Sequence, residues 1–211
     1  MPLPIAVDRL FGALASLWVS LALSPAFAAD CPEPGETRLR AEYADGGVVE
    51  YNLLPEDQVE VFEPAAGGAG EGLVFTSLYG VYDLTMAARE ADGGTDPDRT
   101  LRYGYATEGH PLARPATGAV WVGTALPLWP DGSQSAETAA YVFGREGERQ
   151  LSGCTYRTIP VKVTFMDDQG WVAQDLLYFA DFGLSVTTGR QRVTDRAPRW
   201  RALAGLVAVR P

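Results

Sequence analysis

The sequence predicts an all-β protein whose antiparallel sheet forms a sandwich, a barrel or a half-barrel, after an N-terminal signal helix. Three observations support this fold class. After Pro34, apolar residues recur at every second position, which is the period of a half-buried strand. Strand-like runs follow one another roughly every 10–15 residues and are separated by Gly-rich turns. No long amphipathic helix stands out, and residues 85–91 are the only mild candidate.

The clearest predicted hairpin joins residues 36–43 to residues 48–54. Leu39, Ala41 and Tyr43 share one face of the first run, and Asp-Gly-Gly supplies a tight turn between the two. A second strong hairpin is predicted around the turn 167–170. The other expected strands are 59–63, 73–89 with a bulge or bend at Gly80, 99–106, 119–129 (apolar on both faces and expected to be central), 138–145, 149–156, 161–166, 171–179 and, as the last, 183–193.

The first 28 residues have the pattern of a cleaved signal peptide. Residues 10–23 carry no charge, and Ala26 and Ala28 form an A-x-A site that predicts cleavage after Ala28. The alternative, a membrane-spanning helix, needs about 20 apolar residues, and this run is shorter. We therefore expect a periplasmic or secreted protein with no membrane span after cleavage, in which residues 29–211 form a single β-rich domain. The Ala-, Gly- and Arg-rich, Lys-poor composition suggests a bacterial origin.

Cys31 and Cys154 are the only cysteines of the chain. In an oxidising compartment two cysteines are expected to pair, and this bridge would fasten the mature amino terminus to a strand near residue 154. Lipidation of Cys31 is an alternative, but Asp30 and Ala28 stand where a lipobox has a small residue and a Leu-type residue. A catalytic thiol is a further alternative, but no base is adjacent to either cysteine and no C-x-x-C motif is present.

Composition and motifs exclude several classes of function. A net charge of -10 argues against nucleic-acid binding. One histidine and two cysteines are too few for a closed zinc site or an iron–sulfur cluster, so we expect no metal and no cofactor. His110, in a Gly-His-Pro turn, is the sole candidate base for a hydrolase, and no G-x-S-x-G motif provides a nucleophile. Asp92, Asp96 and Asp98 are spaced unlike an EF-hand and are typical of turns, as are Asp167 and Asp168.

Two groups of residues are candidate binding sites. Aromatic side chains of the strands either fill an ordinary β core or line a cavity that holds an apolar ligand. The ligand-binding candidates are Tyr79, Tyr103, Tyr105, Trp121, Tyr141, Phe143, Trp171 and Tyr178. The basic residues near the C-terminus either belong to a strand beside an acidic neighbour or form a docking patch for a partner. These candidates are Arg190, Arg192, Arg196, Arg199 and Arg201.

The segments 153–156 and 177–186 resemble the carboxy-terminal half of a group of secreted bacterial proteins of unknown function. Those proteins often end their sheet with an aromatic-Ala-x-x-x-Gly-Leu-x-Val hairpin, which Phe179, Ala180, Gly183, Leu184 and Val186 resemble, with two residues instead of three between Ala180 and Gly183. The resemblance covers about a fifth of the chain. It implies a curved antiparallel sheet of the half-barrel type, which periplasmic lipoprotein carriers also use, and it carries no catalytic residue.

The leading hypothesis is a non-enzymatic exported protein that binds an apolar small molecule or a cell-envelope protein. The alternative is a structural or interaction module without a pocket, which uses its strand edges and its Arg-rich end. A secreted hydrolase that depends on His110 ranks third.

Overall fold

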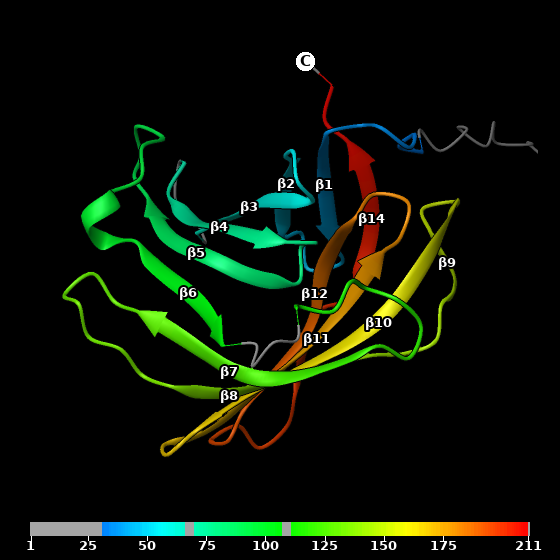
Figure 1. Cartoon of the computed structure of the whole chain (residues 1–211). Helices are drawn as coiled ribbons and strands as arrows, with labels where there is room; N and C mark the ends of the chain where they lie inside the picture. The colour runs from blue at the N-terminus through cyan, green and yellow to red at the C-terminus, as the bar shows by residue number, and fades with distance from the viewer. Residues whose placement is uncertain (1–30, 66–69, 107–110, 211) are drawn as a thin grey trace, which may run out of the picture.

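The computed structural model describes residues 31–65, 70–106 and 111–210, and within them fourteen strands form one antiparallel sheet (Figure 1). The first half of the sheet contains β1 (Arg38–Tyr43), β2 (Val48–Leu53), β3 (Gln58–Pro64), β4 (Gly72–Leu78), β5 (Tyr82–Arg89) and, after the 3-10 turn η1 (Pro97–Arg99), β6 (Leu101–Ala106). The second half contains β7 (Val120–Leu128), β8 (Glu137–Phe143), β9 (Gly147–Leu151), β10 (Cys154–Asp167), β11 (Gly170–Phe179), β12 (Leu184–Arg192), β13 (Arg199–Trp200) and β14 (Leu203–Ala208).

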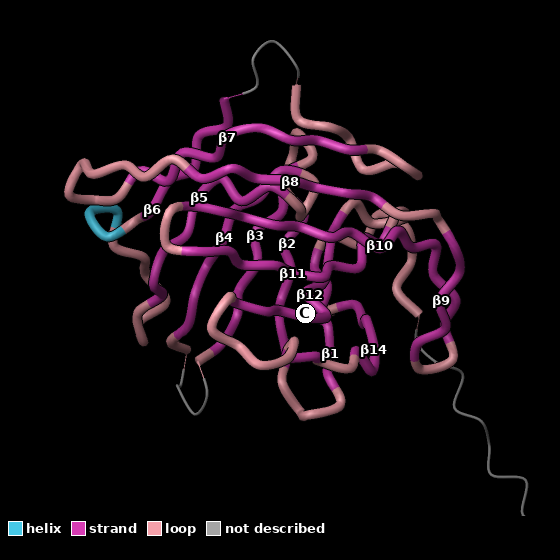
Figure 2. Tube along the Cα trace, turned by 90° about the horizontal axis from the view of Figure 1, so that it is seen from below, coloured by secondary structure: helices cyan, strands magenta, loops and turns pink. Residues whose placement is uncertain are grey.

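The strands follow a meander with one long return. Their order is β13-β12-β11-β10-β8-β7-β6-β5-β4-β3-β2-β1-β14, and β9 pairs with β10 beside this path. The last strand therefore lies next to the first, with Ala41 opposite Leu206. Figure 2 shows β7, β8, β10 and β11 as successive rows from the top of the view downwards, with β1 and β14 near its lower edge. The sheet is strongly curved but does not close into a barrel, as the all-β prediction allowed.

Both predicted hairpins are confirmed. In β1 and β2, Ala41 lies opposite Val49, and alternate residues of each strand are buried. In β10 and β11, Asp167 lies opposite Gly170, and the Asp167 carboxylate accepts hydrogen bonds from the backbone of Gln169 and Gly170. Short Gly-rich turns with an Asp side chain bound to the following backbone therefore formed where the sequence indicated them.

Other expected elements are corrected by the structure. Residues 73–89 do not form one bent strand, because the chain reverses at Gly80 and β4 pairs with β5. Residues 85–91, the mild helix candidate, begin in β5 as strand. The expected strand 149–156 is interrupted at Ser152-Gly153, where β9 turns into β10. In the first and third of these segments, residues with positive φ (Gly80, Ser152 and Gly153) reverse the chain.

One further expectation was wrong: the strand 183–193 is not the last, since β14 pairs with β1 along five residues. The central position expected for the run 119–129 is confirmed, because β7 lies between β6 and β8 in the sheet order. One face of this strand is exposed, since Val120 is 58% exposed and Val122 is 63% exposed. Its apolar outer face therefore meets solvent instead of a second layer.

Curvature lets the inner face of the sheet pack against itself in two clusters. The first lies between the β1, β2 and β14 region and the strands β9 to β12, and includes Leu39, Tyr156, Phe179, Leu184 and Leu206. The second is an aromatic cluster formed by β5, β7, β8, β10 and β11. Its rings meet mostly edge to face, as aromatic pairs prefer, and its members include Tyr82, Trp121, Tyr141, Phe143 and Tyr178.

The turn between β4 and β5 presses directly against β12. Gly80 has φ +62°, and a Cβ placed on it would lie 2.7 Å from the Ser185 nitrogen and 2.9 Å from the Leu184 Cα. The Ser185 hydroxyl donates to the Gly80 carbonyl. Only glycine fits both the backbone conformation and this close approach. The contact brings opposite regions of the curved sheet together.

The predicted disulfide is present. Cys31 and Cys154 are bonded with their Cα atoms 5.6 Å apart. Two hydrogen bonds tie the same strand region to β14: the Tyr156 hydroxyl donates to the Leu206 carbonyl at 2.9 Å, and the Ser152 hydroxyl donates to the Ala204 carbonyl at 2.8 Å. The first described residue and the last strand are therefore both attached around the start of β10.

Candidate functional site

The curved sheet forms an inner hollow of two adjoining lobes, and the smaller lobe opens to solvent past exposed residues such as Met166 and Val193. One has a volume of about 440 Å³ and the other of about 360 Å³. Asp83, Tyr103, Gln174 and Arg190 line both lobes and therefore mark their junction. These four residues come from β5, β6, β11 and β12 respectively, so the hollow lies between the two halves of the sheet.

The larger lobe, called here the arginine lobe, is lined by Arg190, Arg199 and Arg201 together with Tyr43, Phe75 and other residues of β2 to β5. Arg201 is fully engaged in this wall. Its guanidinium lies 3.7 Å from the centre of the Tyr43 ring, and it forms ion pairs with Asp45 at 3.4 Å and Glu63 at 3.5 Å.

The Tyr43 hydroxyl donates to the Thr187 carbonyl of β12 at 2.9 Å, and burial raises the pKa of Tyr43 to about 12. Arg201 and Tyr43 therefore join the first strand to the region of β12 and β13, and they are wall residues of the arginine lobe.

The smaller lobe, called here the carboxyl lobe, combines acidic and aromatic side chains. Asp83, Glu137 and Asp167 supply the carboxyl groups. Tyr103, Phe165 and Trp171 supply the rings, and Arg190 and Arg192 are the cations of this lobe. Of the acidic groups, Asp167 is already used by the turn of the β10–β11 hairpin.

Asp83 is the most unusual side chain of the hollow. Among the described residues its carboxyl has no hydrogen-bond or ion-pair partner, and burial raises its pKa from 3.8 to about 7. Burial is the cause of this shift, and within the described part of the chain no guanidinium forms an ion pair with the carboxyl that would offset the cost of burying the charge. An acidic group held this way reduces stability, which is typical of a functional position.

The backbone around Asp83 explains how the hollow opens. β5 and β6 pair only at Thr85–Arg102 and Met86–Leu101, so the two strands separate before Asp83. Where the ladder has ended, the Tyr105 hydroxyl donates to the Asp83 carbonyl at 2.9 Å. A side chain thus replaces a sheet hydrogen bond, and the gap between the strands leaves the Asp83 carboxyl at the wall of both lobes.

Glu137 resembles Asp83 in lacking a partner within the described part of the chain. Burial and the nearby Asp167 raise the pKa of Glu137, in that order. Tyr103 lines the same lobe as both acids: burial raises its pKa to about 12, with further increases from the charges of Asp83 and Glu137 and an opposing effect of Arg190. The carboxyl lobe therefore holds two carboxyl groups without partners, one of which, Asp83, also borders the arginine lobe.

The eight aromatic residues selected from the sequence divide between hollow and core. Tyr103 and Trp171 line the carboxyl lobe. The remaining six pack into the aromatic core or against it, where Tyr141 is 0% exposed: Tyr79, Tyr105, Trp121, Tyr141, Phe143 and Tyr178. The structure therefore places six of these side chains in the packing of the sheet and two in the wall of the hollow.

The five candidate arginines are also separated by the structure. Arg190 and Arg192 border the carboxyl lobe, and Arg199 forms an ion pair with Asp195 at 3.3 Å. Arg201, in the short link between β13 and β14, joins acidic residues of β3 and of the β1–β2 turn. Arg196 is exposed in the loop between β12 and β13. The basic end is thus partly a structural strand and partly a rim of the hollow.

The remaining candidates from the sequence do not converge on a reactive centre. His110 lies outside the described residues. Asp92 and Asp96 accept backbone hydrogen bonds from Gly94 and Asp98 at 2.9 Å, as turn residues do. In the described ranges no group of three or more His, Cys, Asp or Glu residues is placed to hold a metal ion.

Several lining residues were missed from the sequence, above all Asp83 and Glu137. A signal for Asp83 was present, because an Asp inside the β-prone run Leu78–Arg89 is disfavoured in a strand and has no turn to explain it. Phe75 and Phe165 carried no such signal, since an aromatic residue in a strand has the same alternation whether it packs in the core or lines a hollow.

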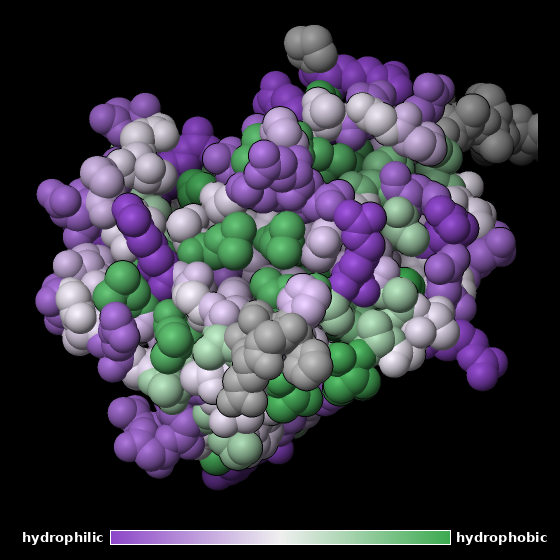
Figure 3. Space-filling model, in the orientation of Figure 1, coloured by the Kyte–Doolittle hydropathy of each residue, from purple (hydrophilic) through white to green (hydrophobic). Residues whose placement is uncertain are grey.

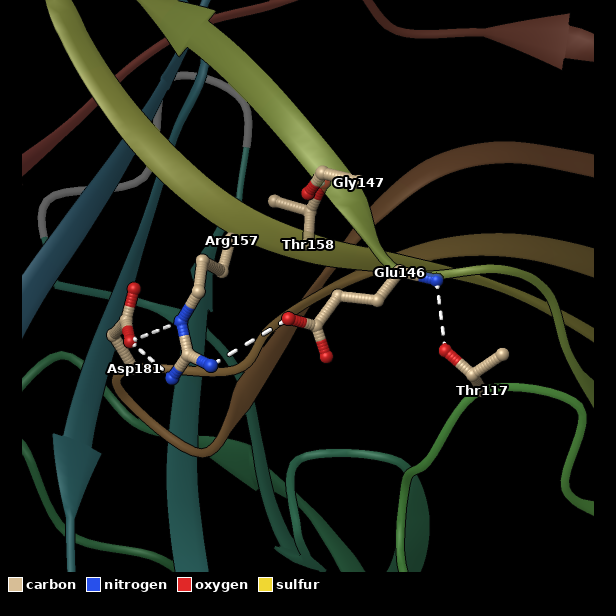
Figure 4. A network of polar contacts seen from close by, with 6 residues as sticks. All are labelled: Thr117, Glu146, Gly147, Arg157, Thr158 and Asp181. Atoms are coloured by element: carbon tan, nitrogen blue, oxygen red, sulfur yellow. Dashed lines mark hydrogen bonds and ion pairs between the residues drawn. The ribbon is translucent and has the colours of Figure 1, made fainter.

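Outside the hollow, the surface carries an exposed polar network and two apolar areas. Arg157 donates to Asp181 at 2.6 Å and forms a weaker ion pair with Glu146 at 3.5 Å, while the Glu146 backbone donates to the Thr117 hydroxyl (Figure 4). These contacts fasten loops to β10 and are exposed, so each contributes little to stability.

Figure 3 shows apolar surface over the β4–β5 region and over β7. None of the helices among the described residues has the length and apolar character to span a membrane.

Comparisons with known proteins give one structural neighbour to report. No family model matches the sequence, and no curated protein matches it. The hypothetical lipoprotein YmcC from Escherichia coli K12 is 10% identical, with a TM-score of 0.40, and the alignment covers 80% of this chain and 83% of that chain. The function is therefore argued below from the residues of the hollow.

Proposed function

We propose that this chain is an exported, non-enzymatic binding protein whose inner hollow holds a small amphipathic molecule. The apolar part of the ligand would lie against Phe75, Met86 and Val61 in the arginine lobe. Its polar part would lie at the junction beside Asp83. This revises the purely apolar ligand expected from the sequence, because charged groups line both lobes.

The uncompensated carboxyl of Asp83 is the observation that carries this proposal. A half-buried charge without a partner costs free energy, and natural sequences retain such groups where a ligand supplies the missing contact. The volume of each lobe lies in the range of small-molecule sites. The paired cysteines support export, because disulfides persist mainly in oxidising compartments.

The test is a ligand screen of the purified mature protein by native mass spectrometry and tryptophan fluorescence. Trp171 lines the hollow, so occupation of the carboxyl lobe should change its emission. Fatty acids, alkylamines, phospholipids and neutral detergents cover the main amphipathic classes. We expect at least one class to bind with 1:1 stoichiometry. No saturable binding by any class would contradict the proposal.

A second candidate is an interaction module that uses the exposed residues of the basic end. Arg192 and Arg196 are exposed, and no ion pair involves their side chains within the described ranges. The variant Arg196→Gln should then weaken capture of an envelope protein while leaving small-molecule binding intact, because Arg196 lines neither lobe. Unchanged capture would remove this candidate.

A further inference from the structure

The two unpartnered acids of the carboxyl lobe indicate which charge its ligand carries. Asp83 and Glu137 line the carboxyl lobe, and neither carboxyl has a hydrogen-bond donor or an ion-pair partner in the described part of the chain. Arg190 and Arg192 line the same lobe, but among the described residues neither forms an ion pair with Asp83 or Glu137. A cation that contacts both acids is therefore the group that would complete this wall.

The surroundings of these acids favour an organic cation over a metal ion. Tyr103, Phe165 and Trp171 line the same lobe, and aromatic faces attract ammonium groups. A divalent metal ion would need several oxygen ligands, and no suitable cluster of three or more acidic, His or Cys residues occurs in the described ranges. Asp167 is committed to its own turn, which leaves two free carboxyls.

We propose that the ligand of the inner hollow carries an alkylammonium group, which the Asp83 and Glu137 carboxylates bind while Tyr103, Phe165 and Trp171 surround it. This inference rests on the proposed function, since it names the chemistry of the ligand for the same hollow. The apolar chain of the ligand would extend from the junction into the arginine lobe, where Phe75 and Met86 provide apolar contacts.

The experiment compares four probes that share one chain length: octylammonium, octyltrimethylammonium, octanol and octanoate. Binding to the mature protein is measured by isothermal titration calorimetry at pH 8. We expect octylammonium to bind at least about tenfold more tightly than octanol, because a charge-assisted hydrogen bond is worth about 1.5–3 kcal/mol. Octanoate should bind more weakly than octanol.

Variants identify the groups responsible. Asp83→Asn and Glu137→Gln should each weaken octylammonium binding about tenfold or more and leave octanol binding within about twofold. Glu148→Gln is the matched control, because Glu148 is an exposed acid on β9 that lines neither lobe. It removes the same charge and should leave the binding of both probes unchanged.

The dependence on pH gives an independent readout. Octylammonium stays charged below about pH 10, so a change between pH 6 and 8 reports the carboxyl groups. With the pKa of Asp83 near 7, binding of octylammonium should be about tenfold weaker at pH 6 than at pH 8. Octanol binding should not change over this range.

The outcomes separate the two proposals. If octanol or octanoate binds as tightly as octylammonium, the hollow is a ligand site but its ligand is not a cation, and this inference is overturned alone. Equal losses in Asp83→Asn and Glu148→Gln overturn it as well. If none of the four probes binds and the wider screen is also negative, both proposals are wrong.

Discussion

The Tyr105 hydroxyl donates to the backbone carbonyl of Asp83 at 2.9 Å, at the point where the ladder between β5 and β6 has already ended. The same hydroxyl lies 3.3 Å from that of Tyr141. A hydroxyl has one proton to donate, so Tyr141 is the donor of the second bond and Tyr105 the acceptor. This relay holds the separated strands in place beside the inner hollow.

Replacing Tyr105 by Phe should therefore destabilise the protein. The substitution leaves the Asp83 carbonyl and the Tyr141 hydroxyl without their partner, which costs about 1–3 kcal/mol in the free energy of unfolding. Urea unfolding monitored by tryptophan fluorescence measures the change. Tyr103→Phe is the control, since no described residue hydrogen-bonds to the Tyr103 hydroxyl. Equal losses in both variants would contradict this role of Tyr105.

Asp83→Asn should stabilise the protein at high pH. The raised pKa means that the folded state binds a proton more tightly than the unfolded state, so stability falls as pH rises from about 4 to about 7. The pKa shift sets an upper limit of about 4 kcal/mol for the gain in the free energy of unfolding. Water in the hollow solvates the carboxylate in part, so we expect a gain of about 2 kcal/mol above pH 7. Urea unfolding at pH 4.5 and pH 8 checks this.

The variant and the parent should differ at pH 8 and nearly coincide at pH 4.5. Glu148→Gln, which removes an exposed acid, should follow the parent at both values. If the parent protein is more stable at pH 8 than at pH 4.5, and Asp83→Asn has the same free energy of unfolding as the parent at pH 8, the charge of the Asp83 carboxylate is not destabilising in solution.

Gly80→Ala tests the contact between the β4–β5 turn and β12. The new methyl group would meet the backbone of Leu184 and Ser185, which cannot move independently of the sheet. We expect a loss of about 2–4 kcal/mol from left-handed strain and overpacking together. Gly132→Ala is the control, because Gly132 also has positive φ but has open space around it. It should cost only about 1 kcal/mol.

Reduction of the Cys31–Cys154 bond should lower stability strongly. The bond joins residues 123 positions apart, and a loop of that length is worth about 4–5 kcal/mol in the chain-entropy model as an upper figure. Urea midpoints with and without dithiothreitol measure the effect. The variant Cys31→Ser, Cys154→Ser should match the reduced parent and should not respond to dithiothreitol. A response in that variant would point to a different origin.

The sequence was sufficient to predict the strands that carry a clear alternation and a strong turn, such as β1 with β2 and β10 with β11. It was insufficient for β14, because Leu203 to Ala208 lies among arginines and becomes a strand only through its pairing with β1. The reversal at Gly80 was also missed, since the close approach of β12 that requires glycine is a tertiary fact.

The two cysteines could be paired from the sequence because only one pairing existed. The site was harder. Tyr103 and Tyr105 alternate identically in β6, yet Tyr103 lines the hollow and Tyr105 packs against the aromatic core. What separates them is the parting of β5 from β6, which no local pattern encodes.

β14 pairs with β1, and Cys31 is bonded to Cys154, so both contacts join partners that are distant along the chain. A nascent chain cannot form the disulfide before residue 154 has been synthesised, or the β1–β14 pairing before residues 203–208 have been synthesised. Such a topology folds slowly, because loop-closure entropy is lost before distant strands gain contacts. Until β14 has paired, one edge of β1 is free to pair with a neighbouring molecule. A chaperone that binds the newly made chain would therefore have most effect before β14 is synthesised.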